Sequence, residues 1–377
     1  MKKSKQKKIG VIRGVIPRVT QAEYASHFSR LKPVFISSKG RRELREFVKK
    51  KKLEWRELEL ENVYGFDPVK WVLGKQTHQS WIRMKRLEEA CKDVDVLEVH
   101  ELYFFDSGQA VEVAKKLGIP LVTDVWTSLA EHLAHKLPPY SWVVRKVMKA
   151  TSLFVARSKR AKKALLKLGA DEKKITTIYY GVNLERFYPR KTEREDKELR
   201  VLFVGRLDKV KGVDMLLEIW SEVMKKEPRA KLWVVGQGGF LERVKKTKGV
   251  KAFGQVEHLR LPEIYRQVDV FVSPTRDIYL GPFKWAEEYF SHTLMEAQAC
   301  GLPIVATRCG GIPEEVGNNN WLVEQEDRKE LVKAMVDCLE DEKQRRKVGK
   351  ENRDRAEKQY DLKKQVKKLE EEIMKLW

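Results

Sequence analysis

Several features that would assign a chain to a particular class of protein are scarce or missing here. The four cysteines, Cys91, Cys300, Cys309 and Cys338, have neither the spacing of a zinc site nor that of a disulfide framework. No apolar run approaches the ~20 residues that span a bilayer, and no apolar stretch follows the basic start, so we expect neither a membrane span nor a secretory signal. No solenoid-type repeat and no nucleic-acid-binding motif is present. These absences favour a globular protein in a reducing, cytoplasmic setting.

Length and pattern predict an α/β protein of two domains. The chain has 377 residues, and apolar strand-like runs alternate with helical patterns throughout, as in parallel βαβ units. A charged stretch, residues 192–197, reads as a linker. We therefore predict a first domain over residues 1–190 and a second over residues 191–360.

Positive charge is concentrated in the first half. Residues 1–190 hold 40 Lys and Arg against 21 Asp and Glu, an excess of 19 out of the net +22 of the chain. Residues 39–52 contain eight cations, and residues 141–170 contain nine cations and no acid. For each cluster alone, an amphipathic helix packed on a sheet is the favoured interpretation. For the whole half, the charge favours an anionic partner such as a membrane surface.

Two acids lie eight residues apart in the stretch Glu288-Tyr-Phe-Ser-His-Thr-Leu-Met-Glu296. A helix is predicted to begin within this stretch and to end at Gly301. Its unpaired N–H groups would suit a phosphate, and carboxylates beside it would suit sugar hydroxyls. The competing interpretation is a capping box, with Thr293 as the N-cap and Glu296 reaching back to it.

A second motif lies upstream. The apolar run 199–204 predicts a buried strand, which leads into Gly205-Arg206-Leu-Asp-Lys-Val-Lys211-Gly and then into a helical pattern over 213–220. Arg206 offers a guanidinium fork and Lys211 a point charge, so the turn could hold a diphosphate. A solvated basic turn is the simpler interpretation of this motif taken alone.

Taken together, these motifs resemble the retaining glycosyltransferases of the GT-B family 4. The resemblance includes the Glu-x7-Glu stretch, the Gly-Arg…Lys-Gly turn and the loop Gly310-Gly-Ile-Pro-Glu314. It extends over residues 198 to about 360 nearly element by element and is looser in the first half. It implies two doubly wound parallel sheets, one in each domain, with the final helix, 361–377, crossing back onto the first domain.

The resemblance also implies roles for individual residues. Arg206 and Lys211 would neutralise the diphosphate of a nucleotide-sugar donor, Glu288 would hold the donor sugar, and Glu296 would bind the ribose. No bound cofactor and no metal is expected. The predicted donor site comprises Gly205, Arg206, Lys211, Gln255, Val256, Glu288, Phe290, Ser291, His292, Thr293 and Glu296.

The first half departs from the family at one position. Relatives often carry a His six residues after a strand proline, and here Pro120 leads to Trp126 instead. His100, at the end of the preceding predicted strand, is one candidate replacement, and it is the one we include with Arg206, Lys211 and Glu288 among the catalytic candidates. Other candidates are Asp124, His132 and His135.

The predicted function is retaining transfer of a hexose-type sugar from a UDP- or GDP-linked donor to an acceptor hydroxyl. A lipid-linked saccharide at the cytoplasmic face of a membrane, or a polysaccharide, would fit the charge as acceptor. Two other interpretations stay open: a sugar-nucleotide epimerase of the same fold, and a non-catalytic protein that binds polyanions or a membrane surface. No specific nucleic acid is expected as a partner.

Overall fold

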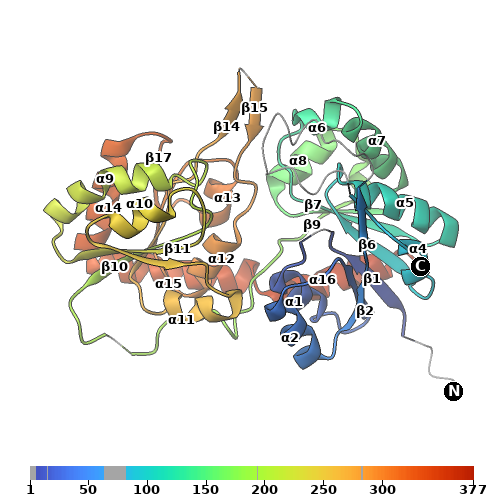
Figure 1. The fold of residues 1–377 in the computed structure, drawn as a ribbon, viewed down its shortest axis with the longest axis horizontal. Helices are drawn as coiled ribbons and strands as arrows, with labels where there is room; N and C mark the ends of the chain where they lie inside the picture. The colour runs from blue at the N-terminus through green and yellow to red at the C-terminus, as the bar shows by residue number, and fades with distance from the viewer. Residues whose placement is uncertain (1–5, 15, 63–81, 193, 282) are drawn as a thin grey trace. The chain divides into compact units, whose positions relative to one another are not determined.

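The computed structural model describes residues 6–14, 16–62, 82–192, 194–281 and 283–377. The chain forms two compact units: unit 1 is Met1–Tyr179 with Lys363–Trp377, and unit 2 is Tyr180–Leu362 (Figure 1). Unit 2 thus begins at residue 180 and not at 191 as predicted. The reason is that residues 180–190 make their contacts within unit 2. The Val182 N–H donates to the Tyr360 carbonyl at 2.7 Å, and the Phe187 ring packs on Tyr265.

Unit 1 is built on a seven-stranded sheet with the strand order β3-β2-β1-β6-β7-β8-β9, in which all neighbours are parallel. A short antiparallel pair, β4 and β5, lies outside it. The strands are β1 (Lys8–Ile12), β2 (Lys32–Ser37), β3 (Glu54–Glu57), β4 (Leu60–Asn62), β5 (Ile82–Met84), β6 (Val96–His100), β7 (Leu121–Val125), β8 (Leu153–Ala156) and β9 (Ile175–Thr177).

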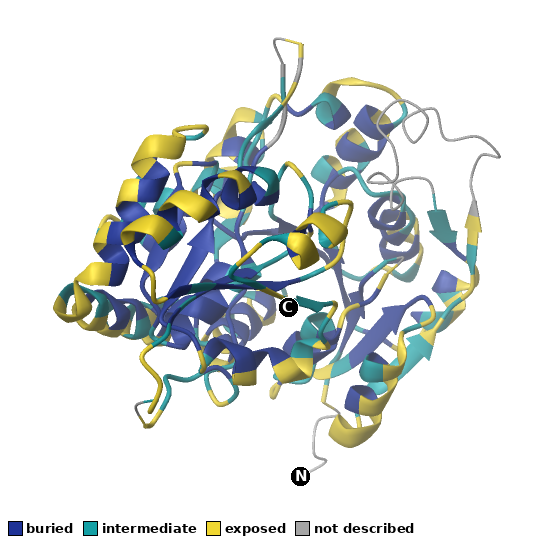
Figure 2. Cartoon of the chain, turned by 60° about the vertical axis from the view of Figure 1, so that its left-hand side comes forward, coloured by how far each residue is buried: buried dark blue, intermediate teal, exposed yellow. Residues whose placement is uncertain are grey.

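The helices of unit 1 bury apolar faces against this sheet. In α2, Leu44, Phe47 and Val48 are buried while the flanking cations are exposed, so the apolar stripe of this basic helix belongs to the core. Figure 2 shows helices of the chain with one side buried and the other exposed. The helices are α1 (Val19–Ala25), α2 (Arg42–Lys51), α4 (Leu87–Ala90), α5 (Phe105–Leu117), α6 (Leu133–Lys136), α7 (Tyr140–Ala150), α8 (Lys159–Lys167) and α16 (Leu362–Met374).

The last helix, α16, is fixed to unit 1 by a buried carboxylate. Glu370 accepts hydrogen bonds from the main-chain N–H groups of Ser29, Arg30 and Leu31 at 2.7–3.0 Å, and from the Ser29 hydroxyl at 3.0 Å. These four hydrogen bonds join the helix to the segment between α1 and β2. The residues after 362 therefore fold with the first part of the chain, although they come last in the sequence.

Unit 2 is built on a six-stranded sheet with the order β12-β11-β10-β13-β16-β17, again with parallel neighbours wherever the register is defined. The hairpin β14-β15 is antiparallel and separate from it. The strands are β10 (Leu199–Val204), β11 (Ala230–Val235), β12 (Val250–Gly254), β13 (Val270–Ser273), β14 (Ile278–Leu280), β15 (Phe283–Ala286), β16 (Ile304–Thr307) and β17 (Trp321–Val323).

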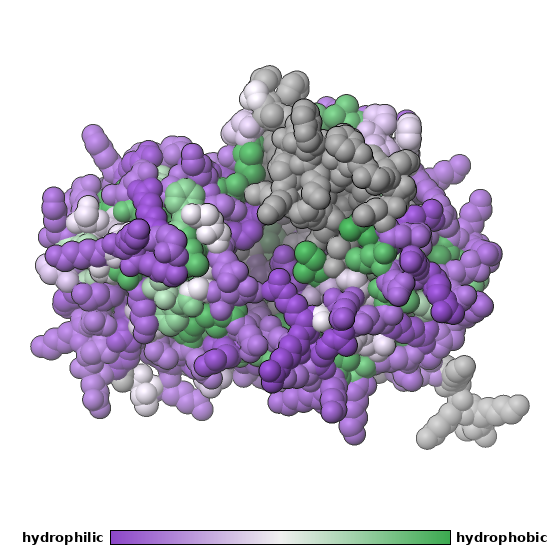
Figure 3. Space-filling view, viewed as in Figure 1, coloured by the Kyte–Doolittle hydropathy of each residue, from purple (hydrophilic) through white to green (hydrophobic). Residues whose placement is uncertain are grey.

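The core of unit 2 lies between this sheet and its helices. Val201, Leu232, Val270 and Val305 of the central strands are fully buried, and Trp220 of α9 packs against them. Hydrophilic side chains predominate on the face of unit 2 that Figure 3 shows. The helices are α9 (Val213–Lys226), α10 (Leu241–Lys246), α11 (Leu261–Tyr265), α12 (His292–Ala299), α13 (Ile312–Val316), α14 (Arg328–Glu340) and α15 (Glu342–Gln359), with a 3₁₀ turn at His258–Arg260.

Both sheets have a doubly wound strand order, which confirms the predicted fold class. In such sheets the chain winds in opposite directions from a central switch point, and ligands bind beyond the carboxyl ends of the strands there. In unit 2 the switch point lies between β10 and β13. The segments that follow these two strands hold most of the predicted donor site, and Gln255 and Val256 of that site follow β12.

Candidate functional site

The turn after β10 is held in place by main-chain hydrogen bonds. The Gly205 N–H donates to the Val235 carbonyl at 3.0 Å, and the Lys211 N–H donates to the Asp208 carboxylate at 3.0 Å. The Arg206 guanidinium lies 3.3 Å from Asp208, and its side chain is 54% exposed. A cation with that exposure can turn toward a bound anion, whereas the main chain that carries it stays fixed.

Two glycines allow this turn to pack against neighbouring main chain. Gly212 has φ +72°, and a Cβ there would lie 1.9 Å from the Pro274 carbonyl oxygen. Gly236 has φ +145°, and a Cβ there would lie 1.8 Å from the Gly205 carbonyl oxygen. Residues with a side chain rarely adopt either conformation. The ends of β10, β11 and β13 are thereby brought together at the switch point.

The predicted diphosphate turn and the predicted sugar-binding acid meet in the structure. The Lys211 ammonium forms an ion pair with the Glu288 carboxylate, and their side chains are 24% and 12% exposed. The two residues are 77 positions apart in the sequence and follow the neighbouring strands β10 and β13. A cation and a carboxylate therefore lie side by side at the carboxyl end of the sheet, in a partly screened position.

The Gly310-Gly311 loop supports the main chain of the acid motif. The Gly311 N–H donates to the Glu288 carbonyl at 2.7 Å. A Cβ on Gly310 would lie 2.2 Å from the Glu288 carbonyl oxygen, and one on Gly311 would lie 2.1 Å from that of Tyr289. The two glycines thus permit a direct main-chain contact, and this contact fixes the main-chain position of Glu288.

The helix after Glu288 begins two residues earlier than the capping-box interpretation requires. Its N-cap is Ser291, not Thr293, and the Ser291 N–H donates to the Glu315 carboxylate at 2.8 Å. In this structure that N–H is therefore occupied by Glu315. Burial holds the pKa of Glu315 well above its usual range. The Phe290 ring is buried against Tyr360, 5.7 Å between centroids.

Glu296 does not reach back to the helix start, so the capping box is absent. Its buried carboxylate instead lies 2.7 Å from His258 Nε2 and accepts a hydrogen bond from the Tyr265 hydroxyl at 3.0 Å. Burial, with Glu296 adding to it, raises the pKa of Tyr265 well above its usual range, so its hydroxyl is a donor. Arg186 donates to the His258 carbonyl at 3.0 Å. Glu296 is therefore oriented from two sides.

These contacts join two parts of the predicted site. His258 comes two residues after Val256, in the loop that follows β12 and includes Gln255. Gln255 is exposed and Val256 partly buried, while His292 packs edge-on against Tyr180 at 4.8 Å. His258, Tyr265 and Glu315 were missed by the sequence prediction. His258 alone carried a signal in the sequence, since it lies two residues from Val256, a predicted donor-site residue.

In unit 1, His100 ends β6 at the switch point of that sheet. Burial, reinforced by Arg13, lowers the pKa of His100 to about 4, so its imidazole is neutral at neutral pH. Its ring packs against Phe104, 5.2 Å between centroids. A neutral His at a strand end can exchange hydrogen bonds with a sugar hydroxyl, and its position as a catalytic candidate stays a prediction.

A buried ionic cluster, which the sequence prediction missed, lies at the same edge of unit 1. Arg13 donates to Glu98 at 2.6 Å, Arg157 pairs with Asp124, and the Tyr24 hydroxyl donates to Glu98 at 2.9 Å. All five side chains are almost fully buried. Two cations balance two carboxylates here, which is the condition under which buried charge is tolerated. Asp124 is thereby committed to this cluster.

Trp126 stands where relatives carry a His, and it is positioned by two acids. Its main-chain N–H donates to Glu101 at 3.0 Å, and its indole N–H lies 3.3 Å from Asp124. Glu101 has φ +67° and also accepts from Thr127. Burial raises the pKa of Glu101 to about 7. These hydrogen bonds fix the loop after β7. At position 126, where relatives often carry a His, this loop carries an indole side chain.

The remaining absences concern metals and membranes. Among the described residues, no group of three or more His, Cys, Asp or Glu could hold a metal ion. All four cysteines are buried free thiols. In the described part of the chain, no helix has both the length and the apolar character needed to cross a membrane.

Comparison with known proteins identifies the family of this chain. The family model described as Glycosyl transferases group 1 matches residues 185–355, and the model described as Glycosyltransferase Family 4 matches residues 23–186. The chain belongs to the family 4 glycosyltransferases. This confirms the resemblance that the motifs indicated.

Curated relatives of the family include two from distant organisms. The sulfoquinovosyl transferase of Arabidopsis thaliana is 30% identical over 291 residues, which cover 70% of this chain and 53% of that protein. D-inositol 3-phosphate glycosyltransferase 2 of Catenulispora acidiphila is 30% identical over 276 residues, covering 64% of this chain and 62% of that protein. The chain thus spans little more than half the length of these relatives.

Solved structures confirm the GT-B fold. HepE of Anabaena, solved in complex with UDP and glucose, has a TM-score of 0.75 at 16% identity, with 98% of this chain and 100% of that chain covered. Sucrose-phosphate synthase of Thermosynechococcus elongatus has a TM-score of 0.68 at 16% identity, with 98% and 99% covered. At these identities the likeness establishes the fold of the family 4 chain and nothing about its substrates.

Proposed function

We propose that this family 4 protein transfers a hexose-type sugar from a nucleoside-diphosphate sugar to an acceptor hydroxyl, with retention of the anomeric configuration. The observation that carries the proposal is the meeting of Lys211 and Glu288 at the switch point of unit 2. The oriented carboxylate of Glu296 lies on the helix that starts beside them. This arrangement supplies a cation for phosphate and acids for hydroxyl groups.

In this proposal the cations act on the leaving group. As the bond between the anomeric carbon and the phosphate oxygen breaks, negative charge grows on the diphosphate, and Arg206 and Lys211 stabilise it. Lys211 is paired with Glu288 before a ligand arrives. A diphosphate would compete for the ammonium and leave the Glu288 carboxylate free for donor-sugar hydroxyls. The acceptor oxygen forms the new bond on the same face of the sugar and passes its proton to the departing phosphate.

Glu296 would bind the ribose hydroxyls of the nucleotide. His258 and Tyr265 hold its carboxylate, and His258 continues from the loop of Gln255 and Val256, which we propose holds the base. Orientation of this kind lowers the entropic cost of reaching a productive geometry. No protein nucleophile is required, so binding and alignment carry much of the catalysis.

The base and the sugar can be found by a thermal-shift panel of UDP, GDP, ADP and their sugar conjugates. A ligand at about 100 times its Kd stabilises the native state by about 2.7 kcal/mol. For a domain of the size of unit 2 this corresponds to a midpoint rise of about 5–10 °C. UDP comes first, because HepE, of similar fold, was solved with UDP and with UDP-glucose.

One nucleoside diphosphate should stand out from the others in this panel. A shift with none of them, together with a shift caused by polyanions, would overturn the transferase proposal in favour of a binding protein. Conversion of a sugar nucleotide without any acceptor would favour the epimerase interpretation. The Arg206→Gln, Lys211→Gln variant serves as control, because it should lose the shift of the best nucleotide.

For the acceptor we propose a sugar hydroxyl of a lipid-linked saccharide or a polysaccharide, reached at the cytoplasmic face of a membrane. One surface of unit 1 supports this. On α7, Trp142 is 57% exposed, and the exposed cations Arg145 and Lys149 follow at helical spacing on the same side; Leu137 nearby is 52% exposed. Exposed aromatic side chains beside cations are typical of helices at an anionic membrane surface.

This surface is tested by sedimentation with vesicles. Binding to phosphatidylcholine vesicles that contain phosphatidylglycerol is expected to exceed binding to phosphatidylcholine alone, and Trp142→Ala is expected to weaken it several-fold. Trp377→Ala is the matched control, because Trp377 is also exposed in unit 1 but is covered by the Lys7 ammonium, 3.6 Å from its ring centroid. Equal binding to both kinds of vesicle would exclude the membrane as a partner.

A further inference from the structure

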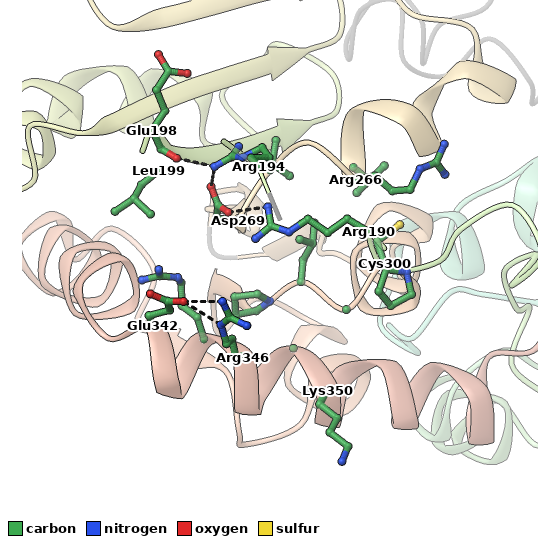
Figure 4. Close-up of a pocket in the computed structure, with 18 of the residues that line it drawn as sticks. Arg190, Arg194, Glu198, Leu199, Arg266, Asp269, Cys300, Glu342, Arg346 and Lys350 are labelled. Carbon is green, nitrogen blue, oxygen red and sulfur yellow. Dashed lines mark hydrogen bonds and ion pairs between the residues drawn. The ribbon is translucent and has the colours of Figure 1, made fainter. Parts of the chain in front are cut away.

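A cavity of about 580 Å³ lies in unit 2 at the end of the sheet opposite to the candidate donor site (Figure 4). Its lining includes Leu199, the first residue of β10, Asp269, which precedes β13, and Pro303, which precedes β16. These are the amino ends of the strands, whereas Gly205 and Glu288 follow carboxyl ends. The volume is that of a small-molecule site.

Positive charge dominates the lining. Nine basic and four acidic residues line the cavity. Asp269 is neutralised by Arg190 at 3.0 Å and by Arg194 at 2.7 Å, and it also accepts the Arg200 N–H at 2.8 Å. Figure 4 shows this cluster on one side and the Glu342–Arg346 pair of α15 on the other. An entering anion would therefore meet an excess of cations, and the acid nearest the sheet is already paired.

Two of these cations are held by main-chain carbonyls. Arg345 donates to the carbonyl of Cys338 at 3.0 Å. Arg353 donates to the carbonyls of Ala299 at 2.7 Å and Phe187 at 3.0 Å, and it also pairs with Glu357 at 2.6 Å. A carbonyl holds a guanidinium in place but does not neutralise it. Lys350 lies on α15 one turn after Arg346, and it makes no ion pair within the described residues. The cavity thus resembles a prepared anion site more than a solvated basic surface.

Two lining residues lead directly to the candidate donor site. Tyr265 lines the cavity and donates its hydroxyl to Glu296 at 3.0 Å. The neighbouring Arg266 also lines it and lies 3.3 Å from the Arg186 carbonyl, while Arg186 donates to the carbonyl of His258, the second partner of Glu296. The helix α12 runs from one site to the other: it begins at His292 beside the acid motif, and Cys300, just after its end, lines the cavity.

We propose that this cavity binds a small phosphate-bearing molecule, and that this ligand and the nucleotide sugar change each other's affinity. The first part rests on the cavity and its charge alone. The second part rests on the proposed function, because it requires a nucleotide held by Glu296. Any such coupling is reciprocal between the two ligands. Tyr265 is the positioning residue through which the cavity would act on the Glu296 carboxylate.

Binding is measured by calorimetric titration with inorganic pyrophosphate. Pyrophosphate would also enter the donor site, so the titration uses the Arg206→Gln, Lys211→Gln variant, in which that site is disabled. On this background, Arg346→Gln with Lys350→Gln removes two charged donors and should weaken binding at least tenfold, the equivalent of about 1.4 kcal/mol. Arg346 and Glu342 are both largely exposed, so their pair adds little to stability.

The matched control is Lys343→Gln with Lys347→Gln. Both residues are exposed on α15, outside the cavity lining, and the change in net charge is the same. One equivalent of pyrophosphate bound by the background and control proteins, with a weaker interaction in the cavity variant, is the expected result. Equal affinity in the cavity and control variants would show that net charge alone attracts the anion, and no binding to the background protein would show that the cavity takes no phosphate; either outcome overturns the site.

Coupling is measured as nucleotide affinity with and without pyrophosphate. Competition at the donor site grows without limit as pyrophosphate is added, whereas an effect through the cavity saturates. We expect a saturating change of about fivefold or more in otherwise native protein, as is typical of coupled sites, and its loss both in the cavity variant and in Tyr265→Phe. Persistence of the full effect in Tyr265→Phe would remove that residue from the coupling. If no nucleotide binds at all, the proposed function fails while the calorimetric result on the cavity still stands.

Discussion

Replacing Glu288 with alanine is expected to abolish sugar transfer while leaving nucleotide binding intact. In the proposed mechanism Glu288 holds the donor sugar, so its loss removes an interaction at the reacting group. Removal of one such polar contact costs about a hundredfold to a thousandfold in turnover. The nucleoside diphosphate does not need this carboxylate. Because Glu288 competes for the Lys211 ammonium, the affinity for the diphosphate should stay the same or rise.

The measurement pairs two readouts on the same protein. Release of nucleoside diphosphate in the presence of acceptor reports turnover, and the thermal shift with the nucleoside diphosphate alone reports binding. The Lys211–Glu288 pair is partly exposed, so the unliganded midpoint should change by no more than about 4 °C, the equivalent of about 1 kcal/mol. Glu288→Gln separates size from charge, since it keeps an acceptor oxygen and removes the carboxylate.

Glu242→Ala is the control for the loss of an acid. Glu242 lies in the first turn of α10, is largely exposed and pairs only with Lys245 at 2.7 Å among the contacts described for it. This variant should turn over at the native rate. Undiminished turnover in Glu288→Ala would remove Glu288 from the mechanism. A joint loss of turnover and nucleotide binding would mean that Glu288 acts on the diphosphate through Lys211 and not on the sugar.

The parts of the site that could be predicted are those fixed by local pattern. An apolar run followed by Gly205, Arg206 and Lys211 reads as a strand and its turn from the sequence alone, and the acid stretch that begins at Glu288 reads as a loop that enters a helix. In a doubly wound sheet, turns after β10 and β13 must meet, because these strands are neighbours at the switch point. That topology brings the two segments to the same edge of the sheet, whereas the Lys211–Glu288 ion pair itself was not predicted, since the hairpin β14-β15 separates β13 from Glu288.

The parts that could not be predicted depend on packing between distant segments. Thr293 and Glu296 have capping-box spacing, yet Glu296 bonds to His258 and Tyr265, which lie 38 and 31 residues away. The buried Tyr265 and the partly buried His258 together outweigh one local cap, which is worth about 1 kcal/mol. Likewise the spacing of Glu315 gives no hint that its carboxylate would accept the Ser291 N–H.

The domain boundary shows the same limit. Composition changes at the charged stretch 192–197, but the chain joins unit 2 at Tyr180, where Val182 pairs with Asp361 in a parallel bridge. Both chain segments that lead toward unit 1 thus run side by side at that edge of unit 2. Linker composition reports exposure, whereas the boundary is set by hydrogen bonds made to residues far along the chain.

Replacing Gly311 with alanine is expected to reduce transfer about a hundredfold, the cost of a misplacement of about 1 Å at a reacting group. The backbone of Gly311 is ordinary, with φ −82°, so the variant tests contact alone and not backbone strain. The new Cβ would lie 2.1 Å from the Tyr289 carbonyl oxygen, so main chain must move, and the main chain in question carries Glu288. The Gly311 N–H bond to the Glu288 carbonyl would be disturbed as well.

Two measurements check this prediction. The free energy of unfolding should fall by about 1–3 kcal/mol, as for other overpacked positions, and turnover should fall by more than that loss of stability explains at a temperature where the protein is folded. Gly239→Ala is the matched control, because a Cβ there would have no heavy atom within 4 Å and the residue also follows β11 in unit 2. Native turnover in a folded Gly311→Ala protein would show that the glycine loop does not position Glu288. Glu288 would then act equally well after its main chain had moved. Catalysis by alignment requires the opposite, namely that a small displacement of Glu288 lowers turnover.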